Sequence, residues 1–204
     1  GRMKTLSLSL RLGATADIPI RVESDELTFA PITAMTKSAP VHIASTGHGI
    51  PDGWRAAVLN AGGMTELNGT WNAIRDSDFR RLAVIDVNTI AFPGVTSAGF
   101  RTYTTGGELA YYTPKDLAGY TGARMDIKRA VGGTVLASLN TTDGTIEIDA
   151  TNGAVWLHVT PTTLAELTAG DYVFDIELLD GTDVLALCSA DSVLHLLPEI
   201  TTST

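Results

Sequence analysis

Cysteine, charge and long apolar runs are all scarce in this chain of 204 residues. Its one cysteine, Cys188, cannot form an internal disulfide or a thiolate-based zinc site. The sequence contains no run of about 18 apolar residues, so no membrane-spanning helix is predicted. Charged residues make up 18%, and 23 acidic against 14 basic residues give a net charge of −9. This sign is opposite to that of most proteins that wrap nucleic acid, and it also disfavours anionic membrane surfaces.

Glycine and apolar residues are abundant, with 20 glycines and 44% hydrophobic residues. This apolar content is enough for a buried core and argues against disorder. Between residues 6 and 12, leucine alternates with polar residues, and this two-residue period favours a half-buried strand over a signal peptide. Similar short segments, separated by turn-forming residues, follow along the chain. The sequence therefore predicts an all-β protein.

The predicted strands are residues 5–12, 18–22, 41–43, 56–59, 71–74, 81–87, 89–92, 124–128, 135–139, 146–148, 154–159, 172–179, 184–188 and 193–197. One segment has a different pattern. Thr160 suits a helix N-cap, Pro161 suits the first helical position, and Gly170 follows the end of the segment. Residues 160–167 are therefore predicted to form one or two helical turns.

The pattern of strands and turn-forming residues changes at two points along the chain. From Pro31, about six short strands fall within about 80 residues, which is typical of a small, tightly curled barrel. After Pro114, strands alternate with turns such as Asp143-Gly144 and Asp180-Gly181, which is typical of a β-sandwich. The strands before Pro31 bury too little surface to be stable alone, so they are expected to join a larger sheet.

The middle segment carries glycine-rich spacings in residues 32–41, 48–53 (HGIPDG), 63–69 (GMTELNG) and 103–107 (YTTGG). These spacings resemble the small β-barrel known as the first catalytic cysteine half-domain of ubiquitin-activating enzymes. The version of this module in structural proteins of tailed phages is the more similar one. The catalytic cysteine of ubiquitin-activating enzymes lies outside this half-domain, so the resemblance implies no ubiquitin chemistry.

Residues 114–125 (PKDLAGYTGARM) resemble the start of Ig-like domains found in phage baseplate and tail proteins. The chain departs from that family at Ala118, where the family tends to have threonine. In the family, an alternating hairpin directly precedes this start, and residues 10–22 would be that hairpin here. The two resemblances together imply an all-β fold in which residues 3–30 and 114–204 form a discontinuous Ig-like β-sandwich, with an inserted small β-barrel at residues 31–113. Such an insertion requires that its ends lie close together at a surface loop.

The resemblance also implies a function without chemistry. The expectation is a non-enzymatic structural component of a phage or prophage particle, associated with the tail or baseplate. It would be assembled in the host bacterial cytoplasm and located in the virion. Its expected partners are other phage structural proteins and further copies of the chain, with neither nucleic acid nor membrane insertion. The alternatives are a receptor- or carbohydrate-binding module at the tail tip, and a capsule-degrading enzyme with a carboxylate pair about 5–10 Å apart.

No catalytic residue, cofactor or metal ligand is predicted. The chain has four histidines, His42, His48, His158 and His195. Their spacing is not that of metal ligands. Of these, His48 is expected to hold a turn by hydrogen bonding, and Cys188 is expected to be a buried thiol. The acidic residues near the C-terminus lack the spacing of calcium ligands and suit a solvated strand face and turn: Asp171, Asp175, Glu177, Asp180 and Asp183.

Aromatic residues supply the candidate interaction surface, because their rings combine a large apolar area with polar groups. The candidates are Trp54, Tyr103, Tyr111 and Tyr112. The alternative interpretation is that the tyrosines fill the seam between the two domains and that Trp71 belongs to the core.

Overall fold

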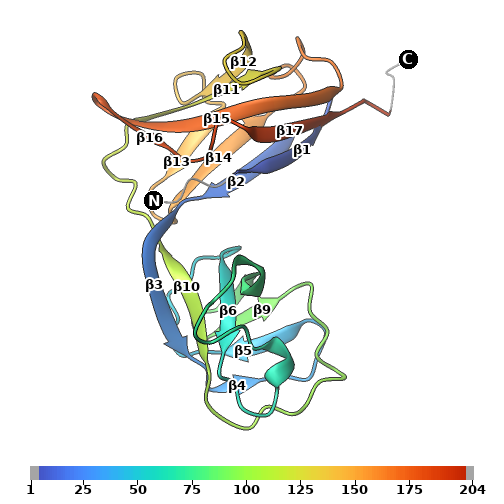
Figure 1. Cartoon of the computed structure of the whole chain (residues 1–204), viewed down its shortest axis with the longest axis vertical. Coiled ribbons are helices and arrows are strands. Elements are labelled where there is room, and N and C mark those ends of the chain that lie inside the picture. Colours follow the sequence, from blue (N-terminus) through green and yellow to red (C-terminus); the bar gives the residue numbers. More distant parts are fainter. Residues whose placement is uncertain (1–4, 201–204) are drawn as a thin grey trace. The chain divides into compact units, whose positions relative to one another are not determined.

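The computed structural model describes residues 5–200, and its regular structure is almost entirely β, with 49% strand and 3% helix (Figure 1). The predicted all-β fold class is confirmed. Residues 3–4 and 201–204 of the predicted sandwich lie outside the described residues. Within the described part of the chain, no helix has both the length and the apolar character needed to cross a membrane.

The chain divides into two compact units, and the second interrupts the first in sequence. The first unit contains the chain up to Val22 and from Pro114 onward, whereas the second is Glu23–Thr113. Residues 23–30, which were predicted to belong to the sandwich, lie in the second unit instead. The reason is that they form most of β3 (Glu23–Pro31), which pairs with β10 (Glu108–Pro114).

Two sheets make up the first unit. The larger has the order β1-β17-β15-β11-β12, with β16 also paired to β15. Its strands are β1 (Ser7–Arg11), β17 (Ser192–Leu197), β15 (Gly170–Asp180), β11 (Gly122–Lys128), β12 (Val135–Asn140) and β16 (Asp183–Ala186). The smaller has the order β13-β14-β2, formed by β13 (Ile146–Asp149), β14 (Ala154–Val159) and β2 (Ala16–Arg21).

The first two strands do not pair with each other, although the resemblance to Ig-like phage domains implied a hairpin at residues 10–22. β1 runs parallel to β17, with Ser7 opposite Val193. β2 runs antiparallel to β14, with Ile20 opposite Val155. Each strand therefore forms the edge of a different sheet, and together they tie the N-terminal segment to the C-terminal one.

One hydrophobic core contains side chains from both sheets of the first unit, which is therefore a β-sandwich. Successive residues of a strand point to opposite faces, so every second side chain is available to this core. The predicted alternation is confirmed on β14 and β15. Its buried residues are Val155, Leu157, Val159, Tyr172, Phe174, Ile176 and Leu178, and Ala154 at the start of β14 is buried as well. Each such side chain contributes about 1.5–3 kcal/mol when it is fully buried.

The second unit contains two four-stranded sheets, and a second core lies among their side chains. The order β3-β10-β6-β7 adds β6 (Arg55–Leu59) and β7 (Arg80–Arg81). The order β4-β5-β9-β8 consists of β4 (Ala34–Met35), β5 (Val41–Ala44), β9 (Thr89–Phe92) and β8 (Ala83–Asp86). Two short 3-10 helices, η1 (Thr65–Leu67) and η2 (Asp76–Asp78), lie between β6 and β7 in sequence. The core includes Val41, Ile43, Trp54, Val58 and Phe92.

Two glycines of the second unit are required by close backbone approaches. Gly63 has φ 78°, and a Cβ atom there would collide with the carbonyl oxygen of Thr102. Gly107 has φ 91°, and a Cβ atom there would lie 2.8 Å from the Cα of Ala61. Glycine is the residue that tolerates both a positive φ and a site with no room for a Cβ atom. Two of the glycine-rich segments seen in the sequence, residues 63–69 and 103–107, thus contain places where loop segments pack tightly against their neighbours.

Two predicted elements are wrong. Residues 71–74 form turns and bends rather than a strand, and Trp71 is 57% exposed rather than a core residue. Their apolar residues do not alternate with the two-residue period of a strand. Residues 160–167 form consecutive turns, and no helix is present there. One of these turns is closed by the hydrogen bond from Leu167 N to Leu164 O. These hydrogen bonds join residues that are three apart in sequence, as in a 3-10 turn. The segment ends before an α-helical turn is established.

Candidate functional site

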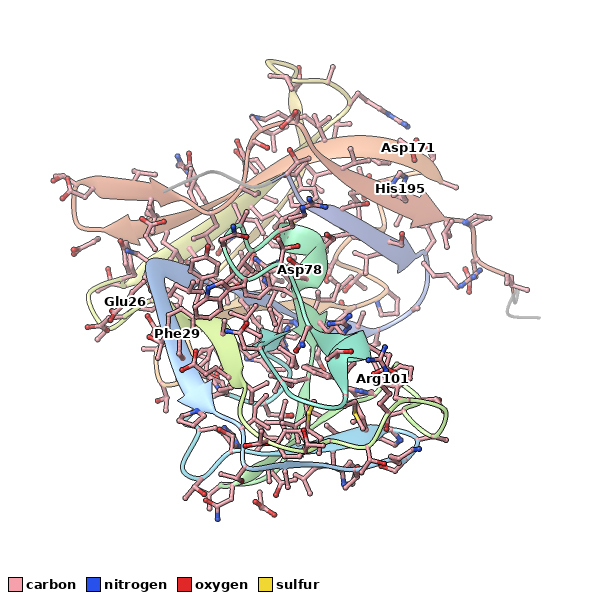
Figure 2. The ribbon with its side chains drawn as sticks, turned by 60° about the horizontal axis from the view of Figure 1, so that its bottom comes forward. Glu26, Phe29, Asp78, Arg101, Asp171 and His195 are labelled. Atoms are coloured by element: carbon pink, nitrogen blue, oxygen red, sulfur yellow. The ribbon has the colours of Figure 1, made fainter. Side chains whose placement is uncertain are left out.

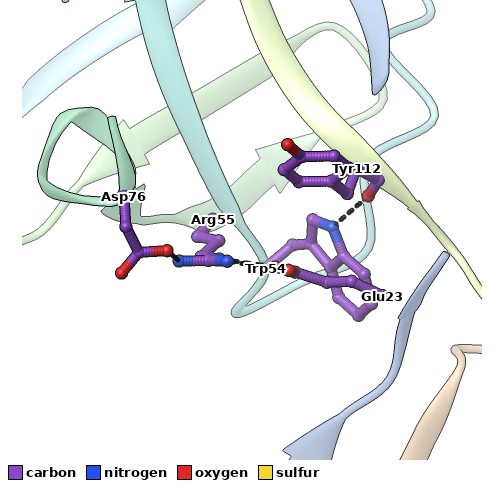
Figure 3. Close-up of polar contacts among 5 residues, drawn as sticks. All are labelled: Glu23, Trp54, Arg55, Asp76 and Tyr112. Atoms are coloured by element: carbon purple, nitrogen blue, oxygen red, sulfur yellow. Dashed lines mark hydrogen bonds and ion pairs between the residues drawn. The ribbon is translucent and has the colours of Figure 1, made fainter. Parts of the chain in front are cut away.

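Two of the four aromatic residues predicted as an interaction surface are buried. Trp54 is 1% exposed, and its Nε1 donates a hydrogen bond of 2.8 Å to the carbonyl oxygen of Tyr112 (Figure 3). Tyr111 is 7% exposed, and its hydroxyl donates to the carbonyl oxygen of His48 at 3.1 Å. Both rings belong to the core of the second unit, so the predicted interaction surface is wrong for these two residues.

Tyr103 and Tyr112 are half-buried, and both are held by their neighbours. The Tyr103 hydroxyl lies 3.1 Å from the carbonyl oxygen of Ile32 and 2.9 Å from that of Gly106. The Tyr112 ring stacks on Phe79, with centroids 5.6 Å apart and planes 25° from parallel. These contacts give both rings a structural role within the second unit.

Arg55, at the start of β6, is the centre of a polar cluster in the second unit (Figure 3). Its Nε and Nη2 lie 2.5 and 2.7 Å from the two carboxylate oxygens of Glu23, and its Nη1 lies 2.7 Å from Asp76 Oδ1. Such a bidentate contact matches the planar guanidinium to a carboxylate. The side chains of Arg55 and Glu23 are only 24% and 12% exposed. The cluster therefore fixes the start of β3 against β6 and η2.

The same guanidinium also packs on an aromatic ring, since Arg55 Cζ lies 5.0 Å from the centroid of Phe79. The hydrogen bond to Glu23 raises the pKa of Arg55, and Asp76 adds to this rise, whereas burial opposes it. Arg55 is thus a fixed cation at every accessible pH. A group of this kind can hold structure together or bind an anion, but it cannot transfer a proton.

His48 lies beneath the turn between β8 and β9 and is 5% exposed. Its Nδ1 accepts a hydrogen bond from the amide of Ile50 at 3.0 Å, and its Nε2 lies 3.1 Å from the carbonyl oxygen of Asp86. Because an amide N–H donates and a carbonyl accepts, the neutral ring carries its proton on Nε2. The predicted role of His48 in holding a turn is confirmed.

His158, on β14, lies between two carboxylates of the smaller sheet in the first unit. Its Nδ1 lies 2.7 Å from Asp17 Oδ1 on β2, and its Nε2 lies 3.3 Å from Glu147 Oε2 on β13. The contact with Asp17 raises the pKa of His158, Glu147 adds to the rise, and burial opposes it. The protonated ring thus joins three strands, one of which comes from the N-terminal segment.

Three further features of the first unit involve titratable groups, namely a buried thiol and two local pairs. Cys188 is buried, as predicted, and burial raises the pKa of its thiol, which keeps it in the unreactive form. Asp171 Oδ1 lies 2.8 Å from His195 Nδ1, directly across β15 and β17 (Figure 2). Glu177 contacts Arg124 at 2.6 Å. Within residues 5–200, no three or more His, Cys, Asp and Glu side chains gather where they could hold a metal ion.

Exposed apolar side chains are the feature that the sequence did not identify. The large ones in the described part of the chain are Phe29, Trp71, Ile85, Val87, Val131, Val135, Leu136, Val184, Leu197 and Ile200. Phe29 projects from β3 (Figure 2). Ile85 and Val87 lie at the turn between β8 and β9, and Val135 and Leu136 begin the edge strand β12. Apolar side chains gathered at strand edges and turns are candidates for contacts with other proteins.

Comparison of the chain with known protein families and with curated proteins gives no match. A functional proposal therefore rests on the fold and on the exposed surface. Two features are informative: the strand order of the first unit, and the apolar side chains that both units present to solvent.

Proposed function

We propose that this chain is a non-enzymatic structural component of a tailed phage or prophage particle, associated with the tail or baseplate. It acts through contacts between its rigid β surfaces and neighbouring proteins of the particle. The observation that carries the proposal is the strand order of the first unit. This order fits the Ig-like sandwich that the resemblance of residues 114–125 implies.

The strand order supports an Ig-like sandwich. Ig sandwiches of the variable type place strands G, F, C and C′ in one sheet, and strands B, E and D in the other. In the first unit, β17, β15, β11 and β12 are neighbours in one sheet, and β2, β14 and β13 are neighbours in the other. With this assignment, β2 is strand B and β11 is strand C. The second unit then occupies the connection between strands B and C.

A tyrosine at the start of β15 supports the same assignment. The Tyr172 hydroxyl donates to the carbonyl oxygen of Thr168 at 2.7 Å and accepts from the amide of Thr168 at 3.1 Å. Many Ig sandwiches carry a tyrosine near the start of strand F whose hydroxyl bonds to the backbone a few residues upstream. Here Arg129 also covers the ring, with its Cζ 4.1 Å from the centroid.

The second unit supports the inserted barrel of the proposal. Short strands in two four-stranded sheets contribute to one core, which is what a small barrel requires. The close approaches at Gly63 and Gly107 lie in the glycine-rich spacings that carry the resemblance to the phage module. In this proposal the whole chain serves as a scaffold.

Purified particles from a host that encodes the chain provide the test. Quantitative mass spectrometry of particles banded in a density gradient is expected to find the chain at a constant ratio to the tail tube protein. Immunogold labelling is expected to place it on the tail or baseplate. An abundant host cytoplasmic protein is the control for contamination. If the chain remains in the soluble fraction of producing cells and is depleted from particles like the control, the proposal is wrong.

Carbohydrate or receptor binding is the second candidate, and Trp71 is the observation that favours it. Its side chain is 57% exposed in the segment between η1 and η2, and an exposed indole suits stacking on a sugar ring. A glycan array with the full chain and with Trp71→Ala tests this function. Binding that the variant loses would support it, and no binding by the unaltered chain would exclude it. Trp54→Ala is unsuitable, because removing a core indole costs about 3–5 kcal/mol.

A further inference from the structure

The turn between β8 and β9 carries two apolar side chains into solvent. Ile85 is 53% exposed and Val87 is 69% exposed. Val87 and Asn88 form the two-residue turn, and the register shifts between Val84 and Asp86, at Ile85. β8 is also an outer strand of its sheet. Two branched apolar side chains at the end of an edge hairpin form a small projecting surface with little conformational freedom.

Hydrogen bonds from neighbouring segments fix the backbone of this turn. The amide of Asn88 donates to Asp86 Oδ1 at 2.7 Å, and the amide of Gly47 donates to Asn88 Oδ1 at 2.9 Å. The amide of Ser45 donates to the carbonyl oxygen of Asn88 at 2.8 Å, and buried His48 donates from Nε2 to the carbonyl oxygen of Asp86 at 3.1 Å. A surface that is already ordered loses little entropy when it binds. This turn therefore needs little further ordering when it binds another protein.

Negative charge borders the apolar tip. Asp86 lies between Ile85 and Val87 in sequence, and Asp52 accepts a hydrogen bond from the amide of Val84 at 2.8 Å. Both aspartates are exposed. The chain as a whole also carries a net charge of −9. A complementary surface would therefore combine an apolar hollow with basic side chains at its rim.

We propose that Ile85 and Val87 insert into an apolar pocket on a different protein of the particle, and that lysine or arginine side chains at the rim of this pocket face Asp52 and Asp86. Charge favours a different protein over a second copy, because two chains of net charge −9 repel each other. This inference rests on the proposed function and names the contact by which the particle holds the chain.

Complementation of a particle that lacks the gene tests the contact with the full-length chain. The variants are the double substitution Ile85→Ser with Val87→Ser, and the matched control Val184→Ser, whose side chain is 53% exposed on β16. All three positions are exposed, so thermal unfolding of the isolated proteins is expected to be unchanged. The amount of chain per particle is expected to fall at least about tenfold for the double variant, and to stay constant for the control.

The outcomes separate the two proposals. Absence of the unaltered chain from complemented particles would contradict the proposed structural role itself. Incorporation of the double variant at the level of the unaltered chain would leave that role intact and overturn the docking inference alone.

Charge variants and sizing test the nature of the partner. Asp86→Asn keeps the oxygen that accepts from Asn88 but removes the charge, and Asp86→Lys reverses it. Incorporation is expected to fall in the order unaltered chain, Asn variant, Lys variant, and equal incorporation of all three would contradict a basic rim. Light scattering of the isolated chain is expected to give a monomer. A dimer that the double variant abolishes would identify a second copy as the partner and overturn the inference.

Discussion

The amide nitrogen of Lys115 lies 2.9 Å from the carbonyl oxygen of Val22, although the whole second unit separates them in sequence. On the other side of the junction, Ser24 Oγ lies 2.5 Å from Thr113 Oγ1. Each unit therefore has its two chain ends held together by its own hydrogen bond. Because the ends of each unit lie close together, the second unit can be inserted without displacing any strand of the first unit. The insertion is therefore compatible with both cores.

Removal of the second unit is expected to leave the first one folded. A chain in which about four Gly and Ser residues replace residues 23–113 needs to span only the gap from Val22 to Pro114. We expect cooperative thermal unfolding, measured by circular dichroism, and a dispersed amide NMR spectrum. A spectrum typical of an unfolded chain would contradict the independence of the two units. The full-length chain is the reference for both measurements.

Tyr172→Phe is expected to destabilise the first unit by about 1–2 kcal/mol. The substitution removes the group that bonds both the amide and the carbonyl of Thr168, while it retains the buried ring. Urea denaturation followed by fluorescence measures the change. Tyr120→Phe is the matched control, because within residues 5–200 the Tyr120 hydroxyl makes no hydrogen bond. Equal stability of the two variants would show that the turn before β15 does not depend on the hydroxyl.

Arg55→Gln is expected to lower the free energy of unfolding of the second unit by about 2–4 kcal/mol. The substitution removes the bidentate contact of Arg55 with the Glu23 carboxylate, which is 12% exposed. Arg124→Gln is the control for an exposed pair, since the Arg124 side chain is 54% exposed beside Glu177, and it is expected to cost less than about 1 kcal/mol.

A double-mutant cycle with Glu23→Gln measures the coupling in the Arg55 pair. We expect the double variant to be more stable than the sum of the two single losses predicts, because each single substitution already removes the Arg55–Glu23 contact and the sum counts that loss twice. Strict additivity would mean that the two side chains do not stabilise each other.

The pH dependence of stability is expected to include a contribution from His158. Its pKa is raised above the ordinary histidine value of 6.5 in the folded state, first by Asp17 and then by Glu147. The contribution is therefore fully present below pH 6.5 and is lost as pH rises through the higher folded value. Because the three side chains are substantially exposed, its size is expected to stay below about 1 kcal/mol.

The comparison with His158→Gln isolates this effect. Urea denaturation across about pH 5.5 to 8.5 is expected to show that the unaltered chain loses its advantage over the variant as the pH rises. A constant difference across this range would contradict the assignment of the pH dependence to His158.

Local patterns predicted most of the strands, because alternating residues reflect which side of a strand faces the core. β14 was predicted with its observed bounds, and β15 differs only by a few residues at its ends. β3 was missed, since its sequence is polar and only its residue Ala30 is buried. Its pairing with β10 is a long-range interaction, and local propensity does not report such pairing.

The candidate surface was predicted less well than the fold. His48 was identified as a turn-holding residue because it lies among turn-forming residues and its imidazole can both donate and accept a hydrogen bond. Trp54 was placed at a surface because a turn precedes it, yet its indole enters the core just before buried β6. The exposure of Ile85 follows a register shift in β8, and such a bulge leaves no reliable mark in one sequence.

The parallel pairing of β1 with β17 also has a consequence for biosynthesis. Ser7 emerges from the ribosome long before Val193, its partner, is translated. The second unit, in contrast, finds all of its strands within residues 23–114, so it can reach its native structure while the larger sheet still lacks its last members. During that interval β1 exposes both of its edges, and a nascent chain must keep this strand from pairing elsewhere until translation is nearly complete.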